Sequence, residues 1–259
     1  MLTRGSPLFY TPRGHYDARM RIGNAMLLAL AVLLPAGCHD KPQPRPLHAA
    51  AWRGDAAAIR QLLDSGADVN EPDDSNAAPL HVAAMGGRTE AIELLLERGA
   101  KTELRDLREQ TPLFVACRFG QQAAARALLD GGADIAGAAQ AGLQPLHVAA
   151  GEGHEAVVRL LLDRGARADC LNAANLTPLH VAAMEGQAAT ARVLLDGGAD
   201  VNAVSAGGTT PLDEAVRQSR QDVQALLVER GGKTHEQLTA EAATRPDTAP
   251  ASQPAKDSP

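Results

Sequence analysis

The stretch TPLHVAAMEGQAATARVLLDGGADVNA, residues 177–203, is typical of two short helices separated by a turn. Pro178 suits the start of the first helix, because the first helical N–H has no partner within a helix and proline lacks it. Gly186 would end that helix, and the pair Leu194–Leu195 gives the second helix an apolar side. Close copies of the stretch recur along the chain, so the interval between them decides the fold.

That interval is 33 residues, kept without slippage across six copies. Each copy has a Pro-Leu pair, a glycine twenty residues after the proline, and an apolar pair just before that glycine. The prolines are Pro46, Pro79, Pro112, Pro145, Pro178 and Pro211. A strict period of this length predicts a solenoid in which stacked copies share one core.

These residues resemble the ankyrin repeat, whose pattern is T-P-L-H-x-A-A, then G-H, and later L-L-x-x-G-A-D-V-N. The resemblance implies an all-α solenoid of six 33-residue helix-turn-helix repeats joined by β-hairpin-like loops, at residues 46–234. It also implies a scaffold that binds another protein, with no enzymatic activity and no cofactor. We expect a monomer.

Two copies depart from the pattern. Three residues before the proline the family prefers glycine, and Glu109 stands there before the third copy, so we expect a distorted hairpin. The sixth copy carries polar residues where the others have small or apolar ones, as expected of a terminal repeat that no neighbour covers. Beyond it, residues 235–259 are rich in Pro and Ala and predict a disordered tail that includes His235.

The composition and charge of the chain exclude some classes of function. Hydrophobic residues make up 45% of the chain but aromatic residues only 2%, so the core must be built from Leu, Ala and Val. Residues 38–259 hold 21 basic and 30 acidic residues, a net charge of −9, which argues against nucleic-acid binding. The three cysteines have neither a disulfide framework nor metal-ligand spacing.

The amino-terminal residues 1–37 resemble a signal peptide. Residues 22–38 contain no charge, and their apolar centre, residues 25–34, follows Arg19 and Arg21. We expect translation to start at Met20, because the residues before it exceed what such a flank needs.

Cys38 follows Ala36 and Gly37, which resembles the lipidation site of a bacterial lipoprotein, although Pro35 departs from that pattern. We expect Cys38 to carry a lipid anchor, with residues 38–45 as a Pro-rich linker, in the periplasm of a Gram-negative bacterium. Ordinary cleavage to a soluble periplasmic product and an uncleaved anchor are the alternatives.

One histidine recurs after the Pro-Leu pair in four copies, and another occupies the family's G-H position. Stacked helices lie about 8–10 Å apart, whereas zinc ligands lie about 2 Å from one metal. We therefore expect these imidazoles to bond the backbone between hairpin and helix, with no metal or catalytic site. The five are His48, His81, His147, His180 and His154.

The two cysteines of the repeats differ in position. Cys117 takes an alanine position on a first helix and should be buried, whereas Cys170 lies in a hairpin linker and should be exposed. A free periplasmic thiol is a target for oxidation. An alternative function is therefore an oxidative-stress accessory protein in which Cys170 is the redox-responsive group.

A partner is expected to bind the hairpin tips and the exposed ends of the first helices. Aromatic residues, Met and Arg, the types enriched at interfaces, gather just before the turn glycines. The structural alternative is that the aromatic ones cover the edges of their own repeats. The candidate binding residues are Trp52, Arg53, Met85, Arg118, Phe119, Met184 and Glu185, with Leu107, Leu143 and Leu176 as tip residues. Resemblance to exported ankyrin proteins implies an immunity or stress-related role without choosing between them.

Overall fold

The computed structural model describes residues 45–244, and within them six pairs of helices follow one another. The first helices of the pairs are α1 (Pro46–Arg53), α3 (Pro79–Met85), α5 (Pro112–Arg118), α7 (Pro145–Gly151), α9 (Pro178–Glu185) and α11 (Pro211–Arg217). The second helices are α2 (Ala56–Asp64), α4 (Thr89–Glu97), α6 (Gln122–Asp130), α8 (Glu155–Asp163), α10 (Ala188–Asp196) and α12 (Gln221–Glu229). The expected signal peptide, Cys38 and the linker up to residue 44 lie outside the described residues.

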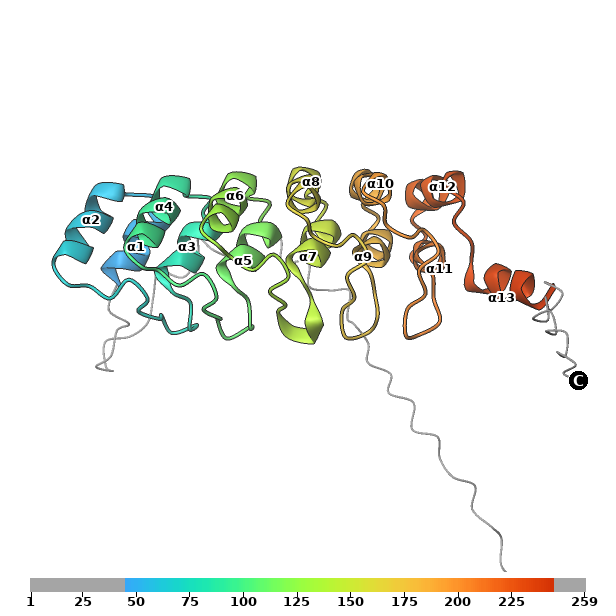
Figure 1. Cartoon of the computed structure of the whole chain (residues 1–259), viewed down its shortest axis with the longest axis horizontal. Coiled ribbons are helices and arrows are strands. Elements are labelled where there is room, and N and C mark those ends of the chain that lie inside the picture. The colour runs from blue at the N-terminus through green and yellow to red at the C-terminus, as the bar shows by residue number, and fades with distance from the viewer. Residues whose placement is uncertain (1–44, 245–259) are drawn as a thin grey trace, which may run out of the picture. The chain divides into compact units, whose positions relative to one another are not determined.

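The helices form two rows, with the first helices beside the hairpins and the second helices on the far side (Figure 1). Each first helix contacts the first helix of the next repeat, and each second helix contacts the next second helix. The described residues contain no β-strand, so the fold is the expected all-α solenoid. None of the helices between residues 45 and 244 has the length and apolar character needed to cross a membrane.

Helix ends follow the signals in the sequence. Helix α9 begins at Pro178, after Thr177 whose side-chain oxygen accepts the N–H of His180. It ends at Gly186, which takes a left-handed conformation with φ of 80°. Glycine reaches this conformation without the steric cost that a Cβ would bring. The same proline start and short helix recur in all six copies, and the positive-φ residue after the helix is glycine in five of them and Ser219, with φ of 56°, in the sixth.

Each repeat contributes to the core two leucines, one from each helix, together with the small residues around them. Leu95, Leu128, Leu161, Leu194 and Leu227 are fully buried, and the alanine pairs of the first helices pack beside them. Leu62 occupies the same position in the first repeat but is only partly buried, because no described repeat precedes it. Stacking between copies therefore creates the core, as the period predicts.

The expected distortion at Glu109 is wrong. Glu109 adopts the left-handed conformation, with φ of 61°, and donates its N–H to the Asp106 carbonyl at 2.9 Å, as Asn76 does to Asp73 at 3.0 Å. The Asp106 carboxylate also accepts two loop N–H groups, at 2.8 and 2.9 Å, which offsets the strain at Glu109.

The irregular hairpin is instead the one that enters the fourth repeat. Ala139 replaces the Asp, Asn or Ser found at the equivalent position of the other hairpins, so no side-chain oxygen can accept the loop N–H groups. There the turn forms a short 3-10 helix, Gln140–Gly142, and Ala141 has a positive φ of 56°. The loss of the side-chain acceptor at Ala139 thus perturbs its hairpin more than the presence of Glu109 at a positive-φ position perturbs the hairpin before it.

The disordered tail expected from residue 235 is also wrong in its first part, because His235–Thr244 form helix α13. The sixth repeat has Asp213 where other repeats have histidine, and this carboxylate accepts the N–H of His235 at 2.9 Å. Gln237 in turn accepts the N–H of Thr234 at 2.9 Å, so the first turn of the helix is capped. Residues 245–259 lie outside the described residues.

Leu161→Ala should lower the free energy of unfolding by about 2–5 kcal/mol, because a fully buried leucine leaves a cavity between two repeats. Leu62→Ala, at the same position of the first repeat, should cost less, because its side chain is already partly exposed. Urea unfolding followed by circular dichroism compares the two. Equal losses would contradict the assignment of the core to inter-repeat stacking.

Candidate protein-binding face

The exposed side of each first helix has a fixed pattern. In α9, Val181 and Met184 are half-buried and Glu185 is exposed, whereas the other residues of the helix are buried. These positions stand three, six and seven residues after the proline, a spacing that puts them on one side of a helix. In all six repeats, the residues three, six and seven positions after the proline and the residue two positions before it form one surface. We call this surface the inner face.

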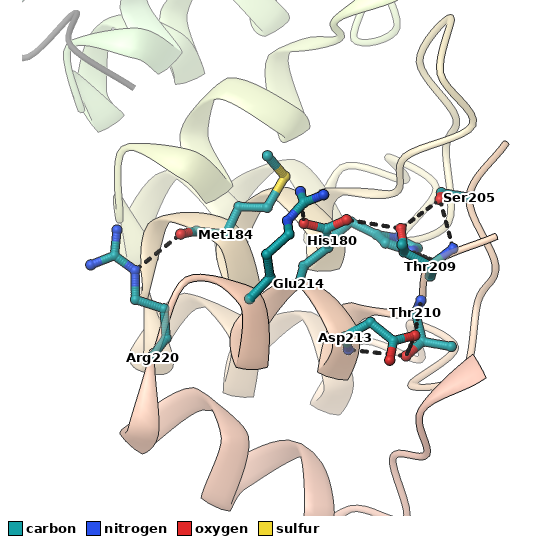
Figure 2. A network of polar contacts seen from close by, with 9 residues as sticks. His180, Met184, Ser205, Thr209, Thr210, Asp213, Glu214 and Arg220 are labelled. Carbon is teal, nitrogen blue, oxygen red and sulfur yellow. Dashed lines mark hydrogen bonds and ion pairs between the residues drawn. The ribbon is translucent and has the colours of Figure 1, made fainter. Parts of the chain in front are cut away.

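Hydrogen bonds from the next repeat hold the ends of the first helices. Arg220, at the start of α12, donates its Nε to the carbonyl of Met184 at 3.0 Å (Figure 2). His154 donates in the same way to the carbonyl of Arg118 at 2.9 Å, which confirms its expected bond to backbone. Equivalent bonds reach the carbonyls of Trp52, Met85 and Gly151. The carbonyls of five successive inner-face positions are therefore fixed before any partner arrives.

The recurring histidines bond the backbone, as expected. The Nε2 atom of His180 lies 3.0 Å from the carbonyl oxygen of Thr209 in the next repeat, and its Nδ1 accepts the N–H of Thr177 at 3.2 Å. His147 and His81 repeat both contacts, and His48 makes the Nε2 contact at 2.9 Å. An imidazole that accepts at Nδ1 and faces a carbonyl through Nε2–H is neutral.

Burial lowers the pKa of His81, His147 and His180, which agrees with the neutral form. Between residues 45 and 244 no group of three His, Cys, Asp or Glu side chains is placed to hold a metal ion. The histidines therefore serve to join repeats.

The candidate residues on the helices all lie on the inner face. Trp52 and Phe119 are each 43% exposed, and Arg53 and Glu185 are also exposed. The Arg118 guanidinium lies 5.9 Å from the centre of the Phe119 ring. Each aromatic residue therefore offers part of its surface to a partner, while neighbouring residues cover the rest. Met85, Arg118 and Met184 are half-buried. Binding by these residues stays a prediction.

The expected tip residues separate into two groups. Leu107 is exposed at the tip of its hairpin, where its N–H bonds the carbonyl of Ser75 at 2.9 Å. Leu143 and Leu176 are not at tips, because they stand three residues further along their hairpins, next to the start of the helix. They are half-buried, and the Leu176 carbonyl accepts from His147. These two leucines belong to the base of the hairpin and to the inner face.

Two exposed apolar residues of the hairpins escaped the sequence reasoning. Leu171 and Val204 are 52% and 46% exposed at equivalent positions of adjacent hairpins. The other hairpins carry Pro72, Arg105 and Ala138 there, so a column-by-column comparison of the copies for apolar outliers would have found them.

The sixth repeat is uncovered on one side, as expected of a terminal repeat, because residues 216–219 are all exposed and Val216 is 52% exposed where the other repeats bury a small residue. Glu214 takes a position where four repeats have valine, yet it is only 3% exposed. Its carboxylate accepts the Thr209 hydroxyl at 2.8 Å (Figure 2). It also pairs with Arg217. A buried charge is tolerated when it is paired and hydrogen-bonded, and both conditions hold here.

The expected exposure of Cys170 is wrong. Its side chain is 6% exposed, and its sulfur lies 3.7 Å from Nδ1 of His147 in the adjacent repeat. Burial raises the pKa of the Cys170 thiol to about 11, so at neutral pH the reactive thiolate is scarce. Cys117 is buried, as expected, and burial raises its pKa as well. Neither thiol has the exposure that the alternative redox function requires.

The buried histidines predict a stability that falls with acidification. In the unfolded chain a histidine takes up a proton below about pH 6.5, whereas the lowered pKa of His81, His147 and His180 keeps them neutral in the folded state. Because the unfolded state then binds more protons, the free energy of unfolding should fall as pH drops below about 6.5. Urea titrations at about pH 7.5 and 5.5 measure it, above the range where most carboxylates titrate. Equal stabilities would show that the folded histidines titrate normally.

Comparison with known proteins gives one family. The family model described as "Ankyrin repeats (3 copies)" matches residues 20–106, 101–172 and 146–237. No curated protein sequence matches the chain. Among solved structures, the ankyrin repeat domain of human ASB11 is 33% identical, with a TM-score of 0.66 over 73% of this chain and 84% of that one.

Two further solved structures are similar at lower identity. An ankyrin repeat domain from Acinetobacter baumannii AYE is 28% identical, with a TM-score of 0.64 over 73% of this chain and 98% of that one. The ankyrin repeat domain of Bcl-3, a member of the IkappaB protein family, is also 28% identical, with a TM-score of 0.66 over 76% of this chain and 89% of that one. The family model, the solved structures and the six stacked helix pairs agree, and the chain belongs to the ankyrin-repeat family.

Proposed function

We propose that this protein is an exported scaffold that captures one partner protein across its inner face. Ankyrin-repeat domains generally mediate protein–protein interaction. The observation that carries the proposal is the half-exposed state of Trp52 and Phe119 on the inner face. Aromatic side chains together with Met and Arg supply most of the binding energy in protein interfaces. No catalytic step is part of the proposal.

The inner face is suited to capture because it is already ordered. Side chains of the following repeat hold the carbonyls of five successive first helices, from Trp52 to Met184. A preformed surface avoids part of the entropy loss that ordering loops and helix ends would add to association. The protein therefore binds without rearranging its helices.

The place of action that we propose is the periplasm, with a lipid on Cys38 as anchor. Support comes from the uncharged stretch of residues 22–38 and from the Ala36-Gly37 pair before the cysteine. The residues between Cys38 and the first helix at Pro46 would separate the membrane surface from the array. Immunity against a toxin and a stress response both need protein capture in this compartment.

Trp52→Ala/Phe119→Ala/Met184→Ala should abolish capture of the partner, because each truncation removes an apolar anchor of the inner face and costs about 1 kcal/mol or more. Pull-down from a periplasmic extract with immobilised protein compares it with wild type. The matched control Arg126→Ala/Arg192→Ala/Val228→Ala truncates three exposed side chains on the second helices and should retain the partner. Equal recovery by the two triple variants would refute the inner face as the binding surface.

Cys38→Ser should remove lipid from the protein, because the lipid is attached through the cysteine sulfur. Metabolic labelling with a palmitate analogue, followed by membrane fractionation, should give a labelled membrane protein for wild type and an unlabelled one for the variant. Cys170→Ser is the control and should keep the label. An unlabelled wild-type protein, or a label that survives Cys38→Ser, would contradict the proposed anchor.

A further inference from the structure

The inner face changes character along the array. Its first three repeats expose Trp52, Arg53 and Phe119, an aromatic and basic surface. In the fourth and fifth repeats the exposed charge at the end of the helix becomes negative, with Glu152 and Glu185. The rest of the inner face in these two repeats carries no charge. We call this part, in repeats four and five, the acidic-edge strip.

Within the strip, each repeat contributes a row that begins apolar and ends in a carboxylate. In the fifth repeat the row is Leu176, Val181, Met184 and Glu185. The sixth repeat shows which positions of a row are neighbours. There Thr209 and Glu214, the equivalents of Leu176 and Val181, form a hydrogen bond of 2.8 Å. The hairpin leucine therefore lies beside the helical valine, at the end of the row away from the carboxylate.

The fourth repeat gives a parallel row with Leu143, Val148 and Glu152, and with Gly151 in place of methionine. A Cβ at Gly151 would lie 2.8 Å from Cγ1 of Val181, so Val181 of the next row already packs against this backbone. The two rows thus meet without a gap. Together they form a continuous apolar surface along one edge and two carboxylates along the other.

The carboxylates are available to a partner. Within residues 45–244 neither Glu152 nor Glu185 forms an ion pair, although other exposed carboxylates do. Arginines bound the strip on both sides, Arg118 in the third repeat and Arg217 in the sixth. At the ends of the first helices the charges of repeats three to six are therefore positive, negative, negative and positive, and Arg217 in the sixth repeat also pairs with the buried Glu214.

We infer that the strip binds a helical segment of the partner, which carries two basic residues seven positions apart beside an apolar side. Stacked helices lie about 8–10 Å apart, so Glu152 and Glu185 are separated by about that distance. Seven residues of an α-helix rise about 10.5 Å, which matches that separation. On the partner helix, an acidic residue seven positions before the first basic residue and another seven positions after the second would face Arg118 and Arg217.

A helix fits the strip better than an extended segment does. The strip has an apolar edge and a charged edge side by side. A partner helix can place apolar side chains on one edge and neighbouring charged side chains on the other at the same time. A strand places alternate side chains on opposite faces, so it presents one row only. The flanking arginines add specificity, because a segment shifted by one repeat would bring basic residues onto Arg118 or Arg217.

This inference rests on the proposed function, since it names the chemistry of the partner for part of the inner face. Two synthetic helical peptides with the same leucine side test it, with four charged residues at seven-residue intervals. One has the order Glu, Lys, Lys, Glu and the other Lys, Glu, Glu, Lys, so the two share composition and net charge. Fluorescence anisotropy of the labelled peptides measures binding to the full chain.

Wild type should bind the Glu-Lys-Lys-Glu peptide about tenfold more tightly than the other, because four exposed charge contacts are attractive in the first order and repulsive in the second. About 1 M salt should reduce the preference. Glu152→Lys/Glu185→Lys should remove it. The control Glu90→Lys/Glu93→Lys makes the same charge change on α4 of the second-helix row and should keep it.

Equal affinity for the two peptides, no measurable binding of either, or loss of the preference in the α4 control would overturn the inference. The proposed function has its own test, which does not depend on the peptides: it fails if alanine at Trp52, Phe119 and Met184 leaves partner capture intact. Loss of capture in that triple variant without any peptide preference would retain the inner face and reject the helical basic partner.

Discussion

No repeat of this chain can bury its own apolar sides, and contact with the next copy supplies the core. Leu161 and its equivalents are fully buried only because another repeat covers them, while Leu62 in the first described repeat is not. Polar contacts follow the same rule. Each recurring histidine meets a carbonyl 29 residues further along, and each side chain at the start of a second helix meets one 36 residues back. Since all these contacts join neighbouring copies, stability and shape arise from the interfaces between repeats.

The same constraint separates residues that build the array from residues that are left for recognition. In α9, packing uses Pro178, Leu179 and the alanine pair, and His180 joins the next repeat. At the end of the helix the Met184 carbonyl accepts from Arg220, while the Met184 side chain is half-buried and the Glu185 side chain is exposed. These two positions hold different residue types in different copies, so the fold does not require one type there. This freedom is why charge and size vary along the inner face while the helices do not.

Features set by the period could be predicted from the sequence. The helix starts, the neutral joining role of His180 and the burial of Cys117 each follow from a residue's place within a copy. Features set by a particular neighbour could not. Cys170 is buried because His147 of the preceding repeat lies against it, and helix α13 starts where it does because Asp213 accepts the N–H of His235. Glu214 is likewise buried by Thr209 and Arg217, a pairing absent from the other copies. Such contacts depend on residues specific to one repeat, so comparison with the consensus does not reveal them.

The central claim is that the partner binds the inner face, where the first helices end in the exposed residues Trp52 and Phe119. Site-specific photo-cross-linking in living cells tests it directly. A photoreactive phenylalanine derivative would be placed at Phe119 on the inner face or, in a separate variant, at Arg126 on the second-helix row. The account predicts a discrete cross-linked product of partner and protein from position 119 and none from position 126. Cross-linking from position 126 alone would contradict it.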